Sequence, residues 1–252
     1  MQFQSPLIPG RLIRRYQRFL ADVDVGGEVL TVHCPNPGTL MGLNTPGARV
    51  WLSRSANAAR RLPHTLELVE VRGTDGTHLV GINTGKPNRL IEAAILNGTI
   101  AELGGYDSLR REVRYGLNSR IDILLSGKAR PDCYVEVKNV HLLREAGLAE
   151  FPDCVTARGA KHLRELAAMI AAGHRSVLVF CVQRADATAF SLADDIDRAY
   201  AAEFGIAIAA GVECLVYRCH ISLDDIRVTG CIPLQFPAKR AEASETGALS
   251  AS

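Results

Sequence analysis

The residues best suited to chemistry lie in one predicted hairpin, residues 119–139. Asp122 interrupts the apolar run of the first arm, and Glu136 and Lys138 lie two residues apart on the second arm. Because side chains alternate along a strand, Glu136 and Lys138 share one side of the sheet. If the hairpin is symmetric about Ala129, Asp122 lies opposite Glu136, with Cβ atoms roughly 4.5–5.5 Å apart.

Two facing carboxylates on a half-buried sheet are unfavourable unless a cation lies between them. Mg²⁺ or Mn²⁺ suits such a position, because these ions bind carboxylate oxygens and keep several water molecules. Lys138 would then stand over that water or over a bound phosphate, which is the arrangement of metal-assisted phosphodiester cleavage. The alternative is an exposed sheet face on which Asp122 pairs with Lys138 and Glu136 is solvated.

The neighbouring Pro131-Asp132 pair does not belong to this site. Asp132 shares a side with Glu136 but lies four residues away, which is about 13 Å along a strand. It cannot share a small ion with Glu136, and we expect it to start the second strand.

Composition indicates an ordinary globular protein. The chain has 252 residues, of which 47% are apolar and 22% charged, so it can bury a sizeable core. Seven cysteines are scattered along the chain without a Cys-x-x-Cys motif. Cys133 and Cys181 lie inside apolar runs, so we expect them to be buried. This use of cysteine suits a reducing cytoplasm. No signal core or run of about 18 apolar residues is present, so we expect a cytoplasmic protein that does not enter the membrane.

Charge is unevenly distributed along the chain. Residues 1–61 contain eight arginines and three acidic residues, a balance of +5, whereas the rest has 21 basic and 24 acidic residues, a balance of −3. A basic end of this kind favours a nucleic-acid partner. Four arginines interleaved with Tyr16 and Phe19 could follow a phosphate backbone and stack on bases. The candidate contacts are Arg11, Arg14, Arg15, Arg18 and Tyr16. The alternative is a solvated basic face over a stripe of core residues.

The first 86 residues are predicted to be mostly β. The apolar spacing within 11–24 favours a helix, although its later part alternates like a strand. The expected strands are Glu28–His33, Ala48–Ser53, His64–Arg72 and Thr77–Ile82. About five short strands in this length favour a small barrel, the oligonucleotide/oligosaccharide-binding (OB) type among them. Asn36 and Thr39, in a Pro/Gly-rich loop, could present polar groups to a ligand or simply form a turn.

A junction at residues 83–88 separates this part from an α/β domain. The expected elements are a helix from Arg89, a strand Ser108–Tyr115, the hairpin, a helix Thr156–Ala172, a strand Ser176–Val182, a helix Asp194–Phe204 and a strand Glu213–Cys219. Strands covered by helices indicate an α/β sandwich with a mixed sheet. The predicted domains are therefore 1–84 and 85–236, and the aperiodic residues 237–252 are expected to be a disordered tail.

Five motifs in the same order resemble the sugar fermentation stimulation protein A (SfsA) family. They are RYQRFLADV (15–23), HCPNPG (33–38), SRID (119–122), CYVEVKN (133–139) and FPDCVTARGAKHLREL (151–166). The resemblance extends from about residue 3 to 235. It implies an N-terminal OB-type barrel joined to a domain of the PD-(D/E)xK nuclease superfamily.

The resemblance also implies functions for individual residues. Asp122 and Glu136 take the metal-ligand positions and Lys138 that of the motif lysine, and Glu92 is similar to the further carboxylate that some superfamily members use. Arg158 and Lys161 correspond to residues placed to touch phosphate. The resemblance further implies that residues 11–23 form a barrel strand, in place of the helix that their spacing favours.

Two positions depart from the family pattern. Asn36-Pro37-Gly38 stands where family members usually have Asn-Thr-Gly, so a hydroxyl is missing from that loop. His141 stands where they usually have Thr or Ser, and we expect it to be a surface side chain.

Two functions are consistent with these residues. The first is a DNA-binding protein of the sugar fermentation stimulation type, which holds backbone phosphates of duplex or single-stranded DNA largely without sequence preference. For this function the resemblance also implies a link to the regulation of sugar metabolism. The alternative is a Mg²⁺- or Mn²⁺-dependent endonuclease that uses Asp122, Glu136 and Lys138. A regulator acting through a protein or sugar partner has no residue-level support. The sequence leaves the oligomeric state open, a dimer included.

Overall fold

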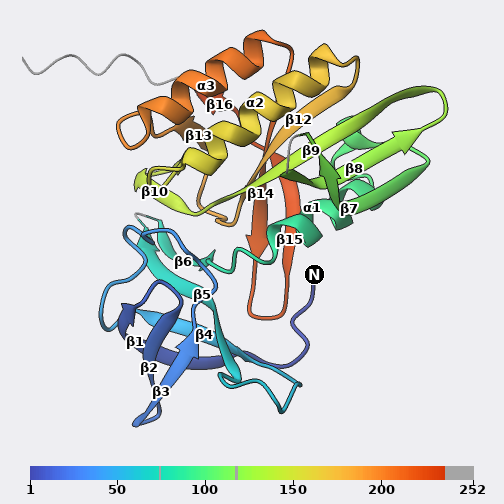
Figure 1. Ribbon diagram of the computed structural model, residues 1–252. Coiled ribbons are helices and arrows are strands. Elements are labelled where there is room, and N and C mark those ends of the chain that lie inside the picture. Colours follow the sequence, from blue (N-terminus) through green and yellow to red (C-terminus); the bar gives the residue numbers. More distant parts are fainter. Residues whose placement is uncertain (74, 117–118, 236–252) are drawn as a thin grey trace, which may run out of the picture.

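The computed structural model describes residues 1–73, 75–116 and 119–235, so the tail predicted over 237–252 lies outside the described residues. Figure 1 shows a barrel of strands below an α/β domain, with the N-terminal segment beside β15. Both parts of the predicted fold class, an OB barrel and an α/β domain with a mixed sheet, are confirmed.

The barrel is built from the first six strands. These are β1 (Ile8–Tyr16), β2 (Leu20–Val25), β3 (Glu28–His33), β4 (Arg49–Arg54), β5 (His64–Gly73) and β6 (Gly76–Gly81). Their order in the sheet is β3-β2-β1-β4-β5-β6, and the parallel pairing of His33 with Thr65 joins β3 to β5 and closes the barrel. Alternate residues such as Leu12, Val32 and Leu66 fill the interior.

The helix favoured by the apolar spacing of residues 11–24 does not form. This segment makes β1 and β2, which turn at Gln17 and Arg18, both with positive φ. Within the supposed helical stripe, Leu12 is buried but Ile13 and Phe19 are exposed. Residues 11–16 of β1 pair with residues 20–24 of β2, and β2 pairs with β3, so sheet pairing outweighs the helical periodicity. The strand implied by the family resemblance is correct, although it is broken into two.

The described residues of the second domain form three α-helices and two sheets. Its helices are α1 (Pro87–Leu96), η1 (Ala101–Leu103, a short 3₁₀ turn), α2 (Ala157–Ala171) and α3 (Arg198–Ala209). Its strands are β7 (Ser108–Tyr115), β8 (Ser119–Gly127), β9 (Arg130–Val140), β10 (Leu142–Glu145), β11 (Leu148–Phe151), β12 (Arg175–Val182), β13 (Ala189–Leu192), β14 (Glu213–Ile221), β15 (Ile226–Cys231) and β16 (Leu234–Gln235).

The main sheet has the order β15-β14-β12-β9-β8-β7. Its three central strands β14, β12 and β9 are parallel, and the outer pairings are antiparallel. The sequence did not indicate the smaller sheet β10-β11-β13-β16, because its strands have only two to four residues and offer no alternation to detect.

Helices cover both faces of the main sheet. In Figure 1, α2 and α3 lie over one face, and α1 lies on the other, between the sheet and the barrel. Strand β12 is buried along nearly its whole length, as its apolar run predicted. The third helix does not start at Asp194, as predicted, but at Arg198. The Asp197 carboxylate caps its N-terminus by accepting a hydrogen bond from the Tyr200 N–H at 2.9 Å.

Hydrogen bonds join the barrel to the α/β domain near the site described below. The Gly81 N–H donates to the Gln183 carbonyl at 3.0 Å, and the Asp153 carboxylate accepts from the Leu40 N–H at 3.2 Å. Cys133 and Cys181 are fully buried, as predicted, and both are free thiols. Among the described residues, no helix combines the length and apolar character that a bilayer crossing requires.

Candidate functional site

The hairpin has the predicted register. Ile123 pairs with Val135, and Leu125 with Cys133, so Asp122 and Glu136 are the next residues along β8 and β9. The turn is at residues 128–129, and β9 starts at Arg130, two residues before the predicted start at Asp132. The apolar residues of both arms enter the cores, which fixes the face on which the two carboxylates lie.

Asp122 is held by two hydrogen-bond donors from different elements. The Asn88 side-chain amide, in the first turn of α1, donates to Oδ1 at 2.8 Å, and the Val137 backbone N–H donates to Oδ2 at 2.7 Å. Burial and the nearby charge of Glu136 nevertheless raise the pKa of Asp122 to about 6. The site therefore holds a carboxylate whose ionised form is disfavoured.

Glu136 is almost fully buried and has one well-bonded oxygen. The Lys138 ammonium donates to its Oε1 at 2.7 Å, and His162 Nδ1 contacts the same oxygen. Burial alone would raise the pKa of Glu136, but Lys138 and His162 outweigh it and hold the pKa below its ordinary value. Its second oxygen, Oε2, is buried and has no hydrogen-bond partner in the described part of the chain. The alternative of a solvated Glu136 beside an Asp122–Lys138 pair is therefore wrong.

These residues line a cleft of about 710 Å³ between the barrel and the α/β domain. Residues of the barrel loops, α1, the hairpin and the start of α2 meet there. The charged and polar residues of its lining include Arg18, Asn36, Asn88, Asp122, Glu136, Lys138, Asn139, His141, Asp153, Arg158 and His162.

The donor set of this cleft suits a hard divalent cation. Glu136 Oε2 and the Asp122 carboxylate are oxygen donors, and an ion that keeps most of its water needs only one or two carboxylates. No group of three His, Cys, Asp or Glu side chains arranged for a metal occurs among the described residues, so water would complete the coordination.

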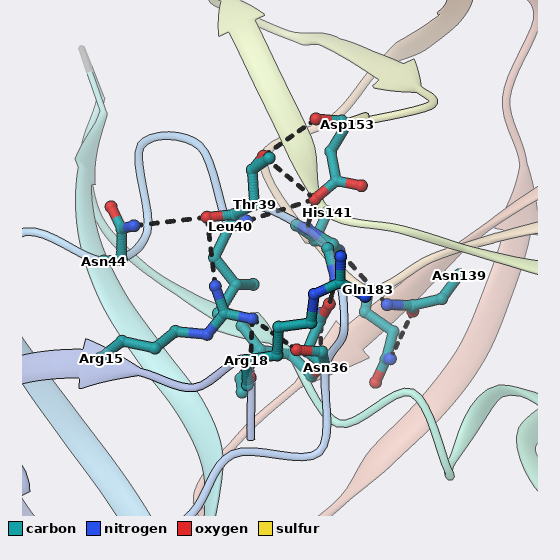
Figure 2. Close-up of polar contacts among 12 residues, drawn as sticks. Arg15, Arg18, Asn36, Thr39, Leu40, Asn44, Asn139, His141, Asp153 and Gln183 are labelled. Carbon is teal, nitrogen blue, oxygen red and sulfur yellow. Dashed lines mark hydrogen bonds and ion pairs between the residues drawn. The ribbon is translucent and has the colours of Figure 1, made fainter. Parts of the chain in front are cut away.

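Of the barrel residues predicted to contact phosphate, some line the cleft and others hold the barrel loops in place. Arg18 is exposed and lines the cleft. Arg15 braces the barrel loop instead, because its guanidinium donates to the carbonyls of Arg18 at 2.8 Å and Asn36 at 2.6 Å (Figure 2). Asn36 is buried, and its amide donates to the Ile82 carbonyl at 2.9 Å, so it holds the loop in place.

The other predicted barrel contacts do not line the cleft. Arg11 donates to the Gly47 carbonyl at 3.1 Å, and Arg14 pairs with Asp22 at 2.8 Å. The Tyr16 hydroxyl donates to the same Asp22 carboxylate at 3.0 Å. These side chains lie on the barrel, outside the cleft that Asp122 and Glu136 line.

Of the residues predicted on helices, Arg158 lines the cleft and Lys161 and Glu92 do not. Arg158 Nε lies 3.3 Å from His162 Nε2, one helical turn further along α2. Lys161 pairs with Glu165 at 3.6 Å, and Glu92 of α1 pairs with Arg111 at 3.4 Å. The residue of α1 that reaches Asp122 is Asn88, one turn before Glu92.

Sequence reasoning missed Asn88 and His162 as members of the site. His162 follows Arg158 by four residues, and this spacing places both side chains on one helix face, so the periodicity of α2 carried a signal. The sequence contains no comparable signal for Asn88, which was assigned to the domain junction. Asn88 reaches Asp122 only because α1 packs on the sheet.

The expectation that His141 is a surface side chain is wrong. His141 is 5% exposed, and its Nε2 lies 3.3 Å from Asp153 Oδ2. Asp153 also accepts from the Leu40 N–H, as Figure 2 shows, and the Thr39 hydroxyl donates to the Asp153 carbonyl at 2.9 Å. Although burial opposes it, His141 and the Leu40 N–H lower the pKa of Asp153 to about 2. This cluster joins the barrel loop to the α/β domain beside the cleft.

Fold and cleft together define a two-domain protein, in which an OB barrel and a mixed α/β domain enclose a carboxylate-lysine site. Residues 13–82 match the family model "SfsA N-terminal OB domain", and residues 85–225 match "Sugar fermentation stimulation protein RE domain". The chain therefore belongs to the sugar fermentation stimulation protein (SfsA) family.

Relatives agree with this assignment over nearly the whole chain. The sugar fermentation stimulation protein homolog of Rhodospirillum centenum is 58% identical over 229 residues, which cover 90% of this chain and 97% of that protein. The homolog of Brucella ovis is 54% identical over 236 residues, or 93% and 98% of the two chains. Among solved structures, Pyrococcus furiosus SfsA in complex with Ca²⁺ is similar with a TM-score of 0.83 and 27% identity, and the match covers 93% of this chain and 99% of that one.

Proposed function

We propose that this chain binds DNA, with a backbone phosphate in the cleft beside a divalent cation that Asp122 and Glu136 hold. The observation that carries the proposal is Glu136 Oε2, a buried oxygen without a hydrogen-bond partner among the described residues. An unpartnered buried carboxylate oxygen costs free energy, and a cation would remove this cost. The same cation would favour the ionised form of Asp122.

A related protein supports the metal part of the proposal. Pyrococcus furiosus SfsA was solved with Ca²⁺, and it shares the fold over nearly the whole of both chains. Ca²⁺, Mg²⁺ and Mn²⁺ all take oxygen ligands, so Mg²⁺ or Mn²⁺ could be bound by the same carboxylates. The nuclease-like character of the second domain rests on the Asp122, Glu136 and Lys138 set.

Cations from both domains support the DNA part. Arg18 of the barrel and Arg158 of α2 line the cleft, and Lys138 lies inside it. Guanidinium groups placed on two sides of a cleft suit a phosphate backbone, which carries no base sequence, so binding should show little sequence preference. A link to sugar metabolism rests on the family's name alone.

DNA binding should weaken steeply as salt rises, because protein cations displace counterions from the phosphates. We expect the double variant Arg18→Gln/Arg158→Gln to weaken binding at least about tenfold and to reduce the slope of log Kd against log salt by about 2. Fluorescence anisotropy with duplex and single-stranded DNA at several salt concentrations, with Ca²⁺ present to prevent turnover, measures both quantities.

The matched control for this titration is Arg164→Gln. Arg164 lies on the same helix as Arg158 but pairs with Glu203 of α3, away from the cleft. Its replacement should leave the salt slope unchanged. An affinity that does not respond to salt, or equal losses in the control and the double variant, would rule out phosphate binding in the cleft.

Phosphodiester hydrolysis is the second candidate, and the position of Lys138 favours it. Its ammonium lies 2.7 Å from Glu136 Oε1 and 3.5 Å from His162 Nδ1, so it is fixed within the carboxylate site. There it can orient a nucleophilic water or stabilise charge on the phosphate, while Arg158 and Arg18 hold the strand. A bound divalent cation would supply acidified water and charge neutralisation at phosphorus.

Hydrolysis should depend on both carboxylates. With Mg²⁺ or Mn²⁺, we expect the wild-type protein to nick supercoiled plasmid, and Asp122→Asn/Glu136→Gln to do so about a hundredfold more slowly or not at all. Gel electrophoresis of the plasmid over time measures the rate. Plasmid left intact by the wild type would exclude hydrolysis of this substrate and leave the binding proposal standing.

A further inference from the structure

A second hollow of about 500 Å³ lies where the ends of β3, β4 and β5 meet the start of α1. None of its lining residues lines the cleft that contains Asp122. We name it the basic pocket, because its charged lining consists of Arg54, Arg60, Lys86, Arg89 and a single carboxylate, Glu67. Four cations and one anion give the lining a balance of +3. The proposed function uses none of these residues.

The positive charge of the basic pocket is largely unneutralised. The side chains of Arg54 and Arg89 have no hydrogen-bond or ion-pair partner within the described structure, and both residues are exposed. Arg60 reaches only His33, whose Nδ1 lies 3.0 Å from Arg60 Nη2. Burial and, after it, the charge of Arg60 lower the pKa of His33, although Glu67 opposes the shift. Several guanidinium groups around a hollow are the usual means of binding a phosphate.

Glu67 gives the basic pocket a second kind of binding group. It is 4% exposed and accepts from the Ser53 hydroxyl at 2.7 Å and the Asn83 amide at 2.9 Å, while Lys86 Nζ lies 3.3 Å away. A carboxylate offers about four lone-pair positions, so these three donors leave room for one more. A carboxylate repels phosphate but accepts hydrogen bonds from hydroxyl groups. The pocket therefore combines groups suited to the two ends of a phosphorylated polyol.

We propose that the basic pocket is a binding site for a phosphorylated polyol, such as a sugar phosphate. Arg54, Arg60 and Arg89 bind the phosphate, and Glu67 accepts a hydrogen bond from a hydroxyl group. The volume is in the range of small-molecule sites. The same chemistry occurs in a free sugar phosphate and in the phosphorylated 5′ end of a nucleic-acid strand. The proposal is independent of the metal site in the cleft.

Isothermal titration calorimetry of the full chain in EDTA and low salt tests the proposal. The probes are inorganic phosphate, glycerol 3-phosphate, a hexose 6-phosphate and the free hexose. We expect the hexose 6-phosphate to bind about tenfold more tightly than inorganic phosphate, because one further hydrogen bond forms, and the free hexose not to bind. Equal affinities for hexose 6-phosphate and inorganic phosphate, or binding of the free hexose, would overturn the assignment.

Variants locate the binding. Arg54→Gln and Arg89→Gln remove charges that have no partner in the fold, so the protein should stay folded while hexose 6-phosphate affinity falls about tenfold for each. Arg110→Gln, on exposed strand β7 outside the pocket, is the matched control and should bind as the wild type does. Asp122→Asn/Glu136→Gln should also bind normally, which separates this site from the cleft. Unchanged affinity in Arg54→Gln and Arg89→Gln would overturn the proposal.

Competition distinguishes the two sources of the ligand. A short 5′-phosphorylated oligonucleotide that displaces hexose 6-phosphate, when its unphosphorylated counterpart does not, would assign the site to strand ends. Failure of both oligonucleotides to displace it would assign the site to the free sugar phosphate. Equal displacement by both would overturn the proposal, because the basic pocket would then bind the phosphodiester backbone.

Discussion

Replacing Asp122 with Asn should stabilise the metal-free protein at neutral pH by about 2–3 kcal/mol. The pKa of Asp122 is raised from 3.8 to about 6 by burial and by the charge of Glu136. A carboxylate with a raised folded-state pKa makes the folded state less stable when it is ionised, by about 1.4 kcal/mol for each pKa unit. Asn carries no charge, and its side-chain oxygen can still accept from the Val137 N–H.

The gain should depend on pH in a defined direction. Above about pH 6 Asp122 is ionised in the folded protein and its full cost is present, so the variant is most stabilised there. As pH falls from 6 towards 4, Asp122 takes up a proton in the folded state first, and the difference between the two proteins shrinks. Urea unfolding of wild type and variant in EDTA at pH 7.5 and pH 4.5 measures the effect. The pKa of Asp153 is lowered instead of raised, but its contribution to stability is the same in both proteins. It therefore cancels in the difference between their free energies of unfolding.

Asp132→Asn, on the same hairpin, is the control for this experiment. Asp132 is partly exposed and lies away from Glu136, so its replacement should change the free energy of unfolding by less than about 0.5 kcal/mol at either pH. A loss of stability in Asp122→Asn at pH 7.5 would contradict the charge conflict between Asp122 and Glu136. Added Ca²⁺ should stabilise the wild type but not Asp122→Asn/Glu136→Gln, because a ligand that binds only the folded state stabilises it.

Replacing Gly38 with Ala should destabilise the protein by about 2–3 kcal/mol. A Cβ at Gly38 would lie 2.7 Å from Asp153 Oδ1 and closer still to Oδ2, so the carboxylate must move. Asp153 would then lose its contact with His141 and its hydrogen bond from the Leu40 N–H, which join the barrel loop to the α/β domain (Figure 2). The lowered pKa of Asp153, about 2, shows that these donors stabilise its ionised form. Their contribution is present above the ordinary pKa of Asp and is lost as pH falls towards 2.

Chemical denaturation with two further variants tests the cause. Gly205→Ala, in helix α3 with open space around it, is the control and should be neutral or stabilise by about 0.5–1 kcal/mol. In an Asp153→Ala background, Gly38→Ala should cost little, because the overlapping carboxylate is gone. If Gly38→Ala is equally costly in both backgrounds, the contact with Asp153 is not the reason that the loop requires glycine.

Patterns confined to short stretches were readable from the chain alone. The hairpin register followed from two β-rich arms around a turn, and it correctly set Asp122 beside Glu136. The span of Ser108–Tyr115 and the doubly buried strand β12 followed from alternation and from a continuous apolar run. In each case the pattern that marks the element lies within the element's own residues, so local spacing is enough to predict it.

Other predictions failed where distant segments decide. Residues 11–24 have helical spacing, yet they form β1 and β2, which pair with each other and, through β3 and β4, join a barrel whose closure depends on segments far along the chain. His141 was expected at the surface, and it is buried because Asp153 and the barrel loop close over it. Arg15 was expected to contact phosphate, but its guanidinium donates hydrogen bonds to the carbonyls of Arg18 and Asn36 in its own domain.

The amino-acid sequence by itself determined the family, the two kinds of fold and the carboxylate pair, because each is encoded in contiguous motifs or in the period of a strand. Only the tertiary structure decided which groups complete the site. Asn88 of α1 donates a hydrogen bond to Asp122, and His162 of α2 contacts Glu136. Glu92 pairs with Arg111 instead of joining the site. Glu136 Oε2 has no hydrogen-bond partner in the described residues. Side-chain partners across a sheet depend on how helices pack against it, and no spacing along the chain specifies that packing.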